Sequence, residues 1–179
     1  GPPLQVVMNF NQSLRGLAVG APVDFRGIVL GEVTNIGIDY DPKAKNFTMP
    51  VTMNIYPERL GQRFRETTES KGEAARRGIV ERLVERGLRG QLRTGNLLTS
   101  QLYVALDLFP KAPAAKIDPA RQPLELPTVP NELEELQVVV ADIAKKLDKV
   151  PFEQIGANLN STLANADRLF KQLDTQVAP

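Results

Sequence analysis

The chain has 179 residues, of which 42% are hydrophobic and 24% charged, so its length allows one domain and an appendage. It contains no cysteine and no histidine, which excludes disulfides, cysteine-based zinc sites, Ser-His-Asp triads and Cys-His pairs. The net charge of +1 gives no electrostatic reason to expect a nucleic-acid partner. We therefore expect neither a metal site nor a cofactor.

The first part of the chain, residues 1–110, has the alternating pattern of half-buried β-strands. Apolar residues at every second position mark strands near residues 4–10, 23–33, 47–55 and 102–108. After Pro57 the apolar spacing becomes helical, and Gly87 stands where a helix would end, which predicts one helix near residues 73–86. Short strands separated by Gly and Pro, with one inserted helix, predict a mainly β fold in the form of a small β-barrel.

Arginines are frequent in and after the predicted helix. They alternate with Glu73, Glu81 and Glu85. This mixture predicts a solvated helix face with intrahelical ion pairs rather than a phosphate-binding stripe. The arginines concerned are Arg76, Arg77, Arg82, Arg86, Arg89 and Arg93.

Two adjacent leucines, Leu97 and Leu98, lie in the middle of the turn formed by residues 94–100. Gly95 and Asn96 are turn-forming residues, and turns between strands are usually exposed and polar. One interpretation is that the loop folds back and covers its own core. The other is that the leucines contact another chain, a lipid or a membrane. We favour it because a second set of apolar residues follows later in the chain, in residues 131–179.

Residues 111–130 are rich in proline and predict a linker. Helix is disfavoured there, because proline lacks the backbone N–H that a helix needs. The short segment Leu124-Glu125-Leu126 could add a last strand to the barrel.

Residues 131–179 predict amphipathic helices with a break at Pro151. Apolar residues before Pro151 follow the alternating three-and-four spacing of a coiled-coil seam, and a second stripe follows Pro151. The tail could pack back on the barrel or self-associate, and we favour self-association. Whether the helices form a bent rod or a hairpin stays open. The seam consists of Leu133, Leu136, Val140, Ile143, Leu147 and Val150.

Two stretches of this sequence resemble the mammalian cell entry (MCE) domain family. The first, residues 14–33, contains Gly20-Ala21-Pro22-Val23, then Arg26-Gly27-Ile28 and Gly31-Glu32-Val33. The second, residues 87–104, begins Gly87-Leu88-Arg89-Gly90 and ends Leu102-Tyr103-Val104. The segments Thr128-Val129-Pro130, Glu134-Glu135-Leu136 and Lys146 to Phe152 resemble the paraquat-inducible protein B branch of that family.

The resemblance implies a seven-stranded barrel that assembles into a homohexameric ring, with the loop at 94–100 lining a central pore. It implies phospholipid as the cargo, an inner-membrane partner and a contact with the outer membrane of a Gram-negative envelope. It also implies a periplasmic location with an anchor in the inner membrane. Gly1-Pro2 is typical of a protease scar, so we expect the chain to be a piece of a longer protein. The resemblance implies that this piece is the last ring domain and the start of a helical needle.

These observations together predict a non-enzymatic lipid-transport component. Leu97 and Leu98 would bind acyl chains in the pore, and the tail seam would continue the apolar path or join the subunits. A structural adaptor that self-associates without carrying lipid is the main alternative. An enzyme would need paired carboxylates, for which Asp39, Asp41 and Glu32 are the candidates, but close acids in a turn are usually solvated.

Overall fold

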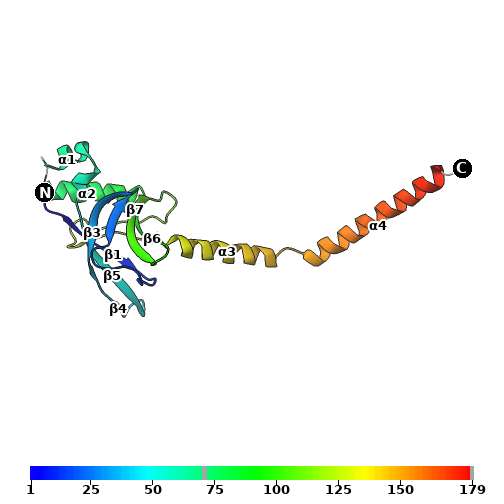
Figure 1. Ribbon diagram of the computed structural model, residues 1–179, viewed down its shortest axis with the longest axis horizontal. Helices are drawn as coiled ribbons and strands as arrows, with labels where there is room; N and C mark the ends of the chain where they lie inside the picture. The colour runs from blue at the N-terminus through cyan, green and yellow to red at the C-terminus, as the bar shows by residue number, and fades with distance from the viewer. Residues whose placement is uncertain (70–71, 178–179) are drawn as a thin grey trace. The chain divides into compact units, whose positions relative to one another are not determined.

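The computed structural model describes residues 1–69 and 72–177 and divides into two compact units, Gly1–Glu134 and Glu135–Pro179 (Figure 1). Within the described residues, the side chains of residues 67–69, 132–135, 137–138 and 175–177 are not described. The first unit contains a curled β-sheet and a helical insertion. Up to residue 177, the second unit consists of two helices separated at residues 149–151, as the proline-interrupted apolar stripes predict.

Seven strands of the first unit form one continuous sheet in the order β6-β7-β2-β3-β5-β1-β8, and β4 pairs only with β5. The prediction of a mainly β fold is therefore confirmed. The strands are β1 (Leu4–Phe10), β2 (Pro22–Phe25), β3 (Ile28–Ile36), β4 (Asp39–Asp41), β5 (Asn46–Ile55), β6 (Leu88–Asn96), β7 (Gln101–Leu108) and β8 (Leu124–Glu125).

The two ends of this sheet are joined by the residues that follow β8. β8 runs parallel to β1, and the chain then passes to β6, the strand at the other end of the order. There the N–H of Gly90 donates to the carbonyl of Pro127 at 3.0 Å, and the N–H of Val129 donates to the carbonyl of Gly90 at 2.9 Å. These bonds satisfy backbone groups that an open sheet edge would expose.

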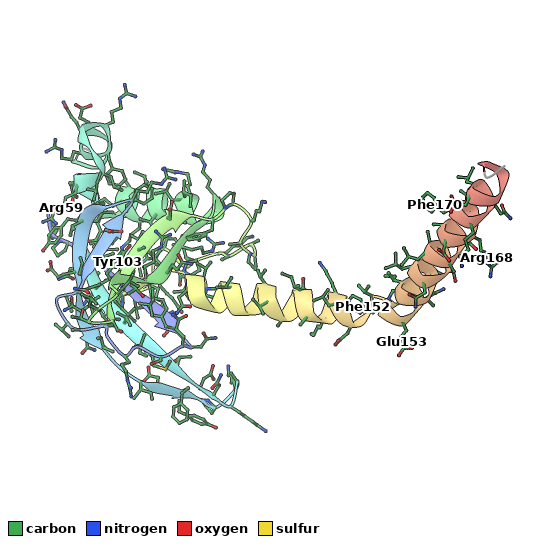
Figure 2. All side chains as sticks on the ribbon, turned by 45° about the vertical axis from the view of Figure 1, so that its right-hand side comes forward. Arg59, Tyr103, Phe152, Glu153, Arg168 and Phe170 are labelled. Atoms are coloured by element: carbon green, nitrogen blue, oxygen red, sulfur yellow. The ribbon has the colours of Figure 1, made fainter. Side chains whose placement is uncertain are left out.

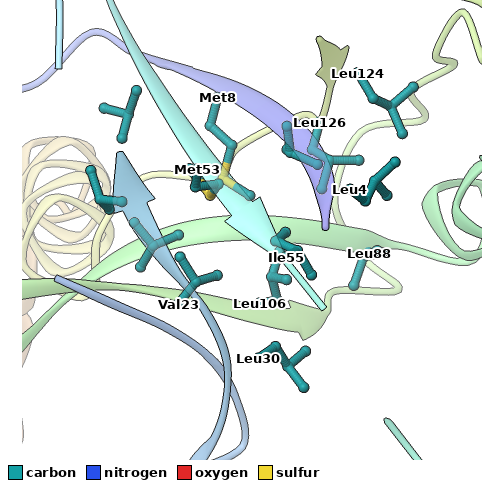
Figure 3. Close-up of a cluster of buried hydrophobic side chains, with 14 of the residues drawn as sticks. Leu4, Met8, Val23, Leu30, Met53, Ile55, Leu88, Leu106, Leu124 and Leu126 are labelled. Carbon is teal, nitrogen blue, oxygen red and sulfur yellow. The ribbon is translucent and has the colours of Figure 1, made fainter. Parts of the chain in front are cut away.

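The inward faces of the strands form one apolar core. Figure 3 shows Leu4, Leu30, Ile55, Leu88 and Leu106, each contributed by a different strand and each almost fully buried. The alternation read from the sequence therefore corresponds to the two faces of the sheet.

Gly31, within the Gly-Glu-Val motif of β3, is fixed by a close backbone approach. A Cβ at this position would lie 1.8 Å from the carbonyl oxygen of Asn54, so any side chain would push β3 and β5 apart. The motif glycine is therefore a packing requirement of the sheet.

The segment between β5 and β6 contains more helix than the sequence predicts. The expected helix near residues 73–86 is α2 (Gly72–Glu85), and it is preceded by a 3₁₀ turn, η1 (Pro57–Leu60), and by α1 (Gln62–Glu69). The prediction of a single inserted helix was wrong. Of the described residues of α1, only Phe64 is strongly apolar, so the segment carries too little periodicity for the helix to be recognised.

Three of the arginines expected on a solvated face are buried. Arg76, Arg77 and Arg89 have 6%, 7% and 3% of their surface exposed. Arg77 does form the expected intrahelical pair with Glu73 at 3.4 Å, but its guanidinium also donates to the carbonyls of Pro119 and Arg121. The prediction of a wholly solvated face was wrong, because arginine can be buried when its donors meet backbone carbonyls.

Residues 111–130, expected to be a linker, lie within the first compact unit. Leu124, Leu126 and Val129 are buried, and the segment contains the short strand anticipated at 124–126. Two of the buried arginines fasten it: Arg77 holds the carbonyls of residues 119 and 121, and Arg89 donates to the carbonyl of Pro113 at 2.9 Å.

The second unit contains most of α3 (Glu132–Asp148) and all of α4 (Phe152–Val177). Pro151 stands between the two helices, and its carbonyl accepts the N–H of Ile155 at 2.9 Å. Pro151 thus supplies the acceptor of the first helical hydrogen bond of α4 from the position just before the helix, where its missing N–H is harmless.

Replacing Arg89 by Met should lower the free energy of unfolding by about 3 kcal/mol, because the buried bonds to the carbonyls of Val84 and Leu88 and the part-buried bond to that of Pro113 would be lost. Urea denaturation measures this. The control is Arg82→Met on the exposed face of α2, which should stay within about 0.5 kcal/mol of the wild type. Equal effects of the two substitutions would contradict a clamping role for Arg89.

Candidate functional site

The candidate site is the tip of the β6–β7 hairpin. The two strands pair from Leu88 and Leu108 at the helical end to Asn96 and Gln101 at the tip, with a register shift between Thr94 and Asn96. The connecting residues, 97–100, form the turn. The hairpin predicted around residues 94–104 is therefore present.

The tip is held in shape by its polar residues and not by its leucines. The side-chain oxygen of Asn96 accepts the N–H of Leu98 at 3.0 Å and that of Thr99 at 3.3 Å. Leu97 and Leu98 themselves are 88% and 97% exposed. The interpretation in which the loop folds back on its own core is thus excluded for the single chain.

The tip end of the hairpin is braced by the loop that contains Gly16. The N–H of Leu102 donates to the carbonyl of Gly16 at 2.8 Å. Gly16 has φ of +96°, and a Cβ there would lie 2.1 Å from the carbonyl oxygen of Ser100. Only glycine therefore allows the start of residues 14–33 to lie against the hairpin tip, so the exposed leucines belong to a turn that is fixed on one side.

A group of charged residues links β2, β6 and β7 beside this hairpin. Arg26 donates to the carboxylate of Asp107 at 3.1 Å, and Arg93 lies 3.9 Å from the same carboxylate. Burial raises the pKa of Asp107, but the N–H of Leu108 and the two arginines outweigh burial, and the pKa is lowered. The pKa of Asp24 is raised by burial, against the opposing effect of Arg93. These charges join β6, β7 and the turn that follows β2.

The carboxylates considered for catalysis either stabilise a turn or are exposed. Asp41 accepts the N–H of Lys43 at 2.9 Å and that of Ala44 at 3.3 Å, so its carboxylate stabilises the β4–β5 turn. Asp39 and Glu32 are exposed on β4 and β3. Among the described residues, no cluster of acidic side chains is arranged to hold a metal ion.

The apolar stripes of the tail are exposed in the single chain. Leu136, Val140, Ile143 and Leu147 are between 49% and 58% exposed, and Val150 is half-buried. The side chain of Leu133 lies outside the described residues. On α4, Figure 2 labels Phe152 and Phe170, which are 60% and 68% exposed. Within residues 1–69 and 72–177, no helix combines the length and apolar character that crossing a bilayer requires.

A further exposed apolar group on the β4–β5 hairpin was missed by the sequence analysis. Ile38, Tyr40 and Phe47 are more than half exposed, and the two aromatic rings contact each other with centres 5.2 Å apart. The sequence signal, alternation on both sides of a turn, is the same for a buried and an exposed hairpin, so it could not distinguish them.

The sequence of the first unit matches a known family. The MlaD protein family matches residues 2–108, which is more than half of the chain and contains both family-like stretches and the hairpin tip. The chain belongs to the MlaD family. The MCE domain resemblance is confirmed at this level, while the branch within the family stays a prediction.

Among solved structures, this MlaD family member is similar to a chain of the Acinetobacter MlaFEDB complex in the ATP-bound Vtrans1 conformation. The sequence identity is 14%, the match covers 72% of this chain and 71% of that chain, and the TM-score is 0.37. We base the family assignment on the sequence match alone.

Replacing both tip leucines by Asn should leave the stability of this MlaD family member within about 0.5 kcal/mol of the wild type, because neither side chain is buried in the fold. The matched control is Leu92→Asn on β6, which is fully buried and should cost several kcal/mol, about 3 or more. Urea denaturation compares them. A large loss in the double variant would mean that the leucines pack within the folded chain.

Proposed function

We propose that the protein is a non-enzymatic lipid-transport component in which Leu97 and Leu98 bind acyl chains. The observation that carries the proposal is the exposure of these adjacent leucines, 88% and 97%, on a braced hairpin of a MlaD family domain. Burying one leucine side chain is worth about 2 kcal/mol, so two exposed together on a fixed tip favour an apolar partner.

The geometry of the tip suits a pore lined by several copies of the chain. In a ring, the hairpin tips of neighbouring subunits would converge on the axis and form an apolar constriction. Acyl chains could cross it without contacting water, and head groups would be tolerated because the contacts are to hydrocarbon. We propose a homohexamer, the state that the MCE resemblance implies.

The exposed seam of α3 gives the tail a role in the same assembly. Apolar side chains that are about half exposed along a helix are stabilised when a second helix covers them. We propose that Leu136, Val140, Ile143 and Leu147, with Leu133 before them and Val150 after them, join copies of the chain or continue the apolar path.

Within the family, we propose the paraquat-inducible protein B branch, because the segments from Thr128 to Phe152 resemble it. We therefore place the protein in the periplasm, attached to the inner membrane and moving phospholipids between the inner and outer membranes. It would act with an inner-membrane partner and reach the outer membrane through its helical tail.

A structural adaptor is the second candidate, favoured by the same exposed seam. In that case the tail would join subunits and no lipid would enter the ring. The two functions differ at the hairpin tip, because an adaptor has no use for Leu97 and Leu98, whereas a conduit requires them.

Lipid retention tests the proposal. Protein purified in mild detergent should retain phospholipid, measured by mass spectrometry of an organic extract, and Leu97→Asn with Leu98→Asn should lower the retained amount at least about tenfold. The control replaces both leucines by Met, which keeps the apolar tip and should keep the lipid. Equal retention in the Asn and Met variants would exclude the pore role.

Light scattering tests assembly. We expect a mass about six times the 19.7 kDa of the chain, and a lower mass after Val140→Asn with Ile143→Asn in the seam. Lys145→Asn, an exposed substitution on the same helix, is the control and should leave the mass unchanged. A monomer in all three proteins would contradict a ring formed by this chain alone.

A further inference from the structure

A second apolar site lies inside the first unit, at the end of the sheet that the helical insertion covers. It is a cavity of about 270 Å³ between the strand ends and the segment containing η1, α1 and α2. Leu30 and Leu106 of the strands form one side. Leu60, Phe64, Ile79 and Leu83 of the helical segment form the other.

The lining of this cavity selects hydrocarbon. Its walls are formed entirely by apolar side chains, and no polar surface faces the space. A polar group placed there would lose its hydrogen bonds to water without replacement. For comparison, a buried cavity of about 150 Å³ with Leu, Ile and Phe walls binds benzene. A volume of about 270 Å³ therefore has room for a longer hydrocarbon segment.

The cavity reaches the surface of the protein. Two of its lining residues, Leu60 and Leu108, are 41% and 36% exposed, whereas Leu30 and Leu106 are buried. A chain could thus enter from solvent while a bulky head group stays outside.

The cavity is separate from the hairpin tip. Leu88 and Leu108, which pair at one end of β6 and β7, line the cavity, while the leucine pair follows Asn96 at the other end. Asn96 lies eight positions after Leu88 along β6, which corresponds to about 26 Å at about 3.3 Å per residue. Binding in the cavity therefore needs neither the tip nor a ring.

We propose that each subunit binds a single hydrocarbon chain of a lipid in this cavity, beneath the helical segment. The site goes beyond the pore proposed above, because it lies within one subunit. It gives the helical insertion a function, since Phe64, Ile79 and Leu83 close the apolar end of the sheet around the ligand.

Titration with free fatty acids tests the site in the whole chain. We expect one molecule bound per subunit by calorimetry, with the affinity rising about fourfold per added methylene from octanoate upward, a factor that corresponds to about 0.8 kcal/mol. The rise should stop once the cavity is full. Ile79→Phe, which fills the cavity, should weaken dodecanoate binding at least about tenfold.

Two controls separate this site from the pore. Ile38→Phe makes the same change at a position that is 67% exposed and outside the cavity lining, so dodecanoate binding should not change. Leu97→Asn with Leu98→Asn removes the proposed pore contact, so the dodecanoate that this variant still binds reports on the cavity, and adding Ile79→Phe should weaken that binding at least about tenfold. If the tip variant abolishes dodecanoate binding and Ile79→Phe does not, the cavity proposal is wrong and the tip is the site of chain binding.

A measurement on the unaltered protein keeps the test independent of how Ile79→Phe folds. Stearate with a spin label near its methyl end should broaden the NMR methyl signals of Leu60, Ile79 and Leu83, while those of Leu136 and Leu159 in the tail stay sharp. Equal broadening of all five signals, or no broadening, would overturn the proposal.

Discussion

The fold depends on how residues 111–130 are fastened to the sheet. β8 pairs with β1, the following residues bond to Gly90 of β6, and the guanidinium groups of Arg77 and Arg89 hold the carbonyls of the preceding proline-rich stretch. Without these contacts β1 and β6 would be open edges, and the buried faces of Leu124 and Leu126 would be exposed to water. The proline-rich segment therefore completes the sheet although it contains little regular secondary structure, because its carbonyls accept hydrogen bonds from Gly90, Arg77 and Arg89.

The apolar residues of this chain fall into a buried set and an exposed set, and the proposed function rests on the exposed set. Nearly all apolar side chains on the inner face of the sheet are covered, yet the leucine pair at the hairpin tip and the stripes of α3 and α4 are exposed. The tip has the firmest support, because Asn96 and Gly16 fix the backbone around it without help from the leucines. The exposed surface is thus separable from the stability of the fold, which suits a surface kept for binding.

Much of the strand arrangement follows from local pattern. The alternation at Leu4, Val6, Met8 and Phe10 and that at Leu102, Val104 and Leu106 identified real strands, since one face of each is buried. α1 was not predicted, because Phe64 is its one strongly apolar residue among those described. The burial of Arg76 and Arg77 was not predicted, because the carbonyls that accept from them belong to Pro2 and Pro119, which are distant in the sequence.

The sequence by itself determined the family, the strands near residues 4–10, 23–33, 47–55 and 102–108, the helix at α2 and the leucine pair in a turn, because each depends on residues close together in the chain. It did not identify β4 and β6 as strands. Only the tertiary structure decided three further points. The proline-rich segment joins the sheet, three arginines are buried, and an apolar cavity forms beneath the helical segment. Each of these needs surfaces from strands and helices that are remote in sequence, and no local pattern encodes how well such surfaces fit.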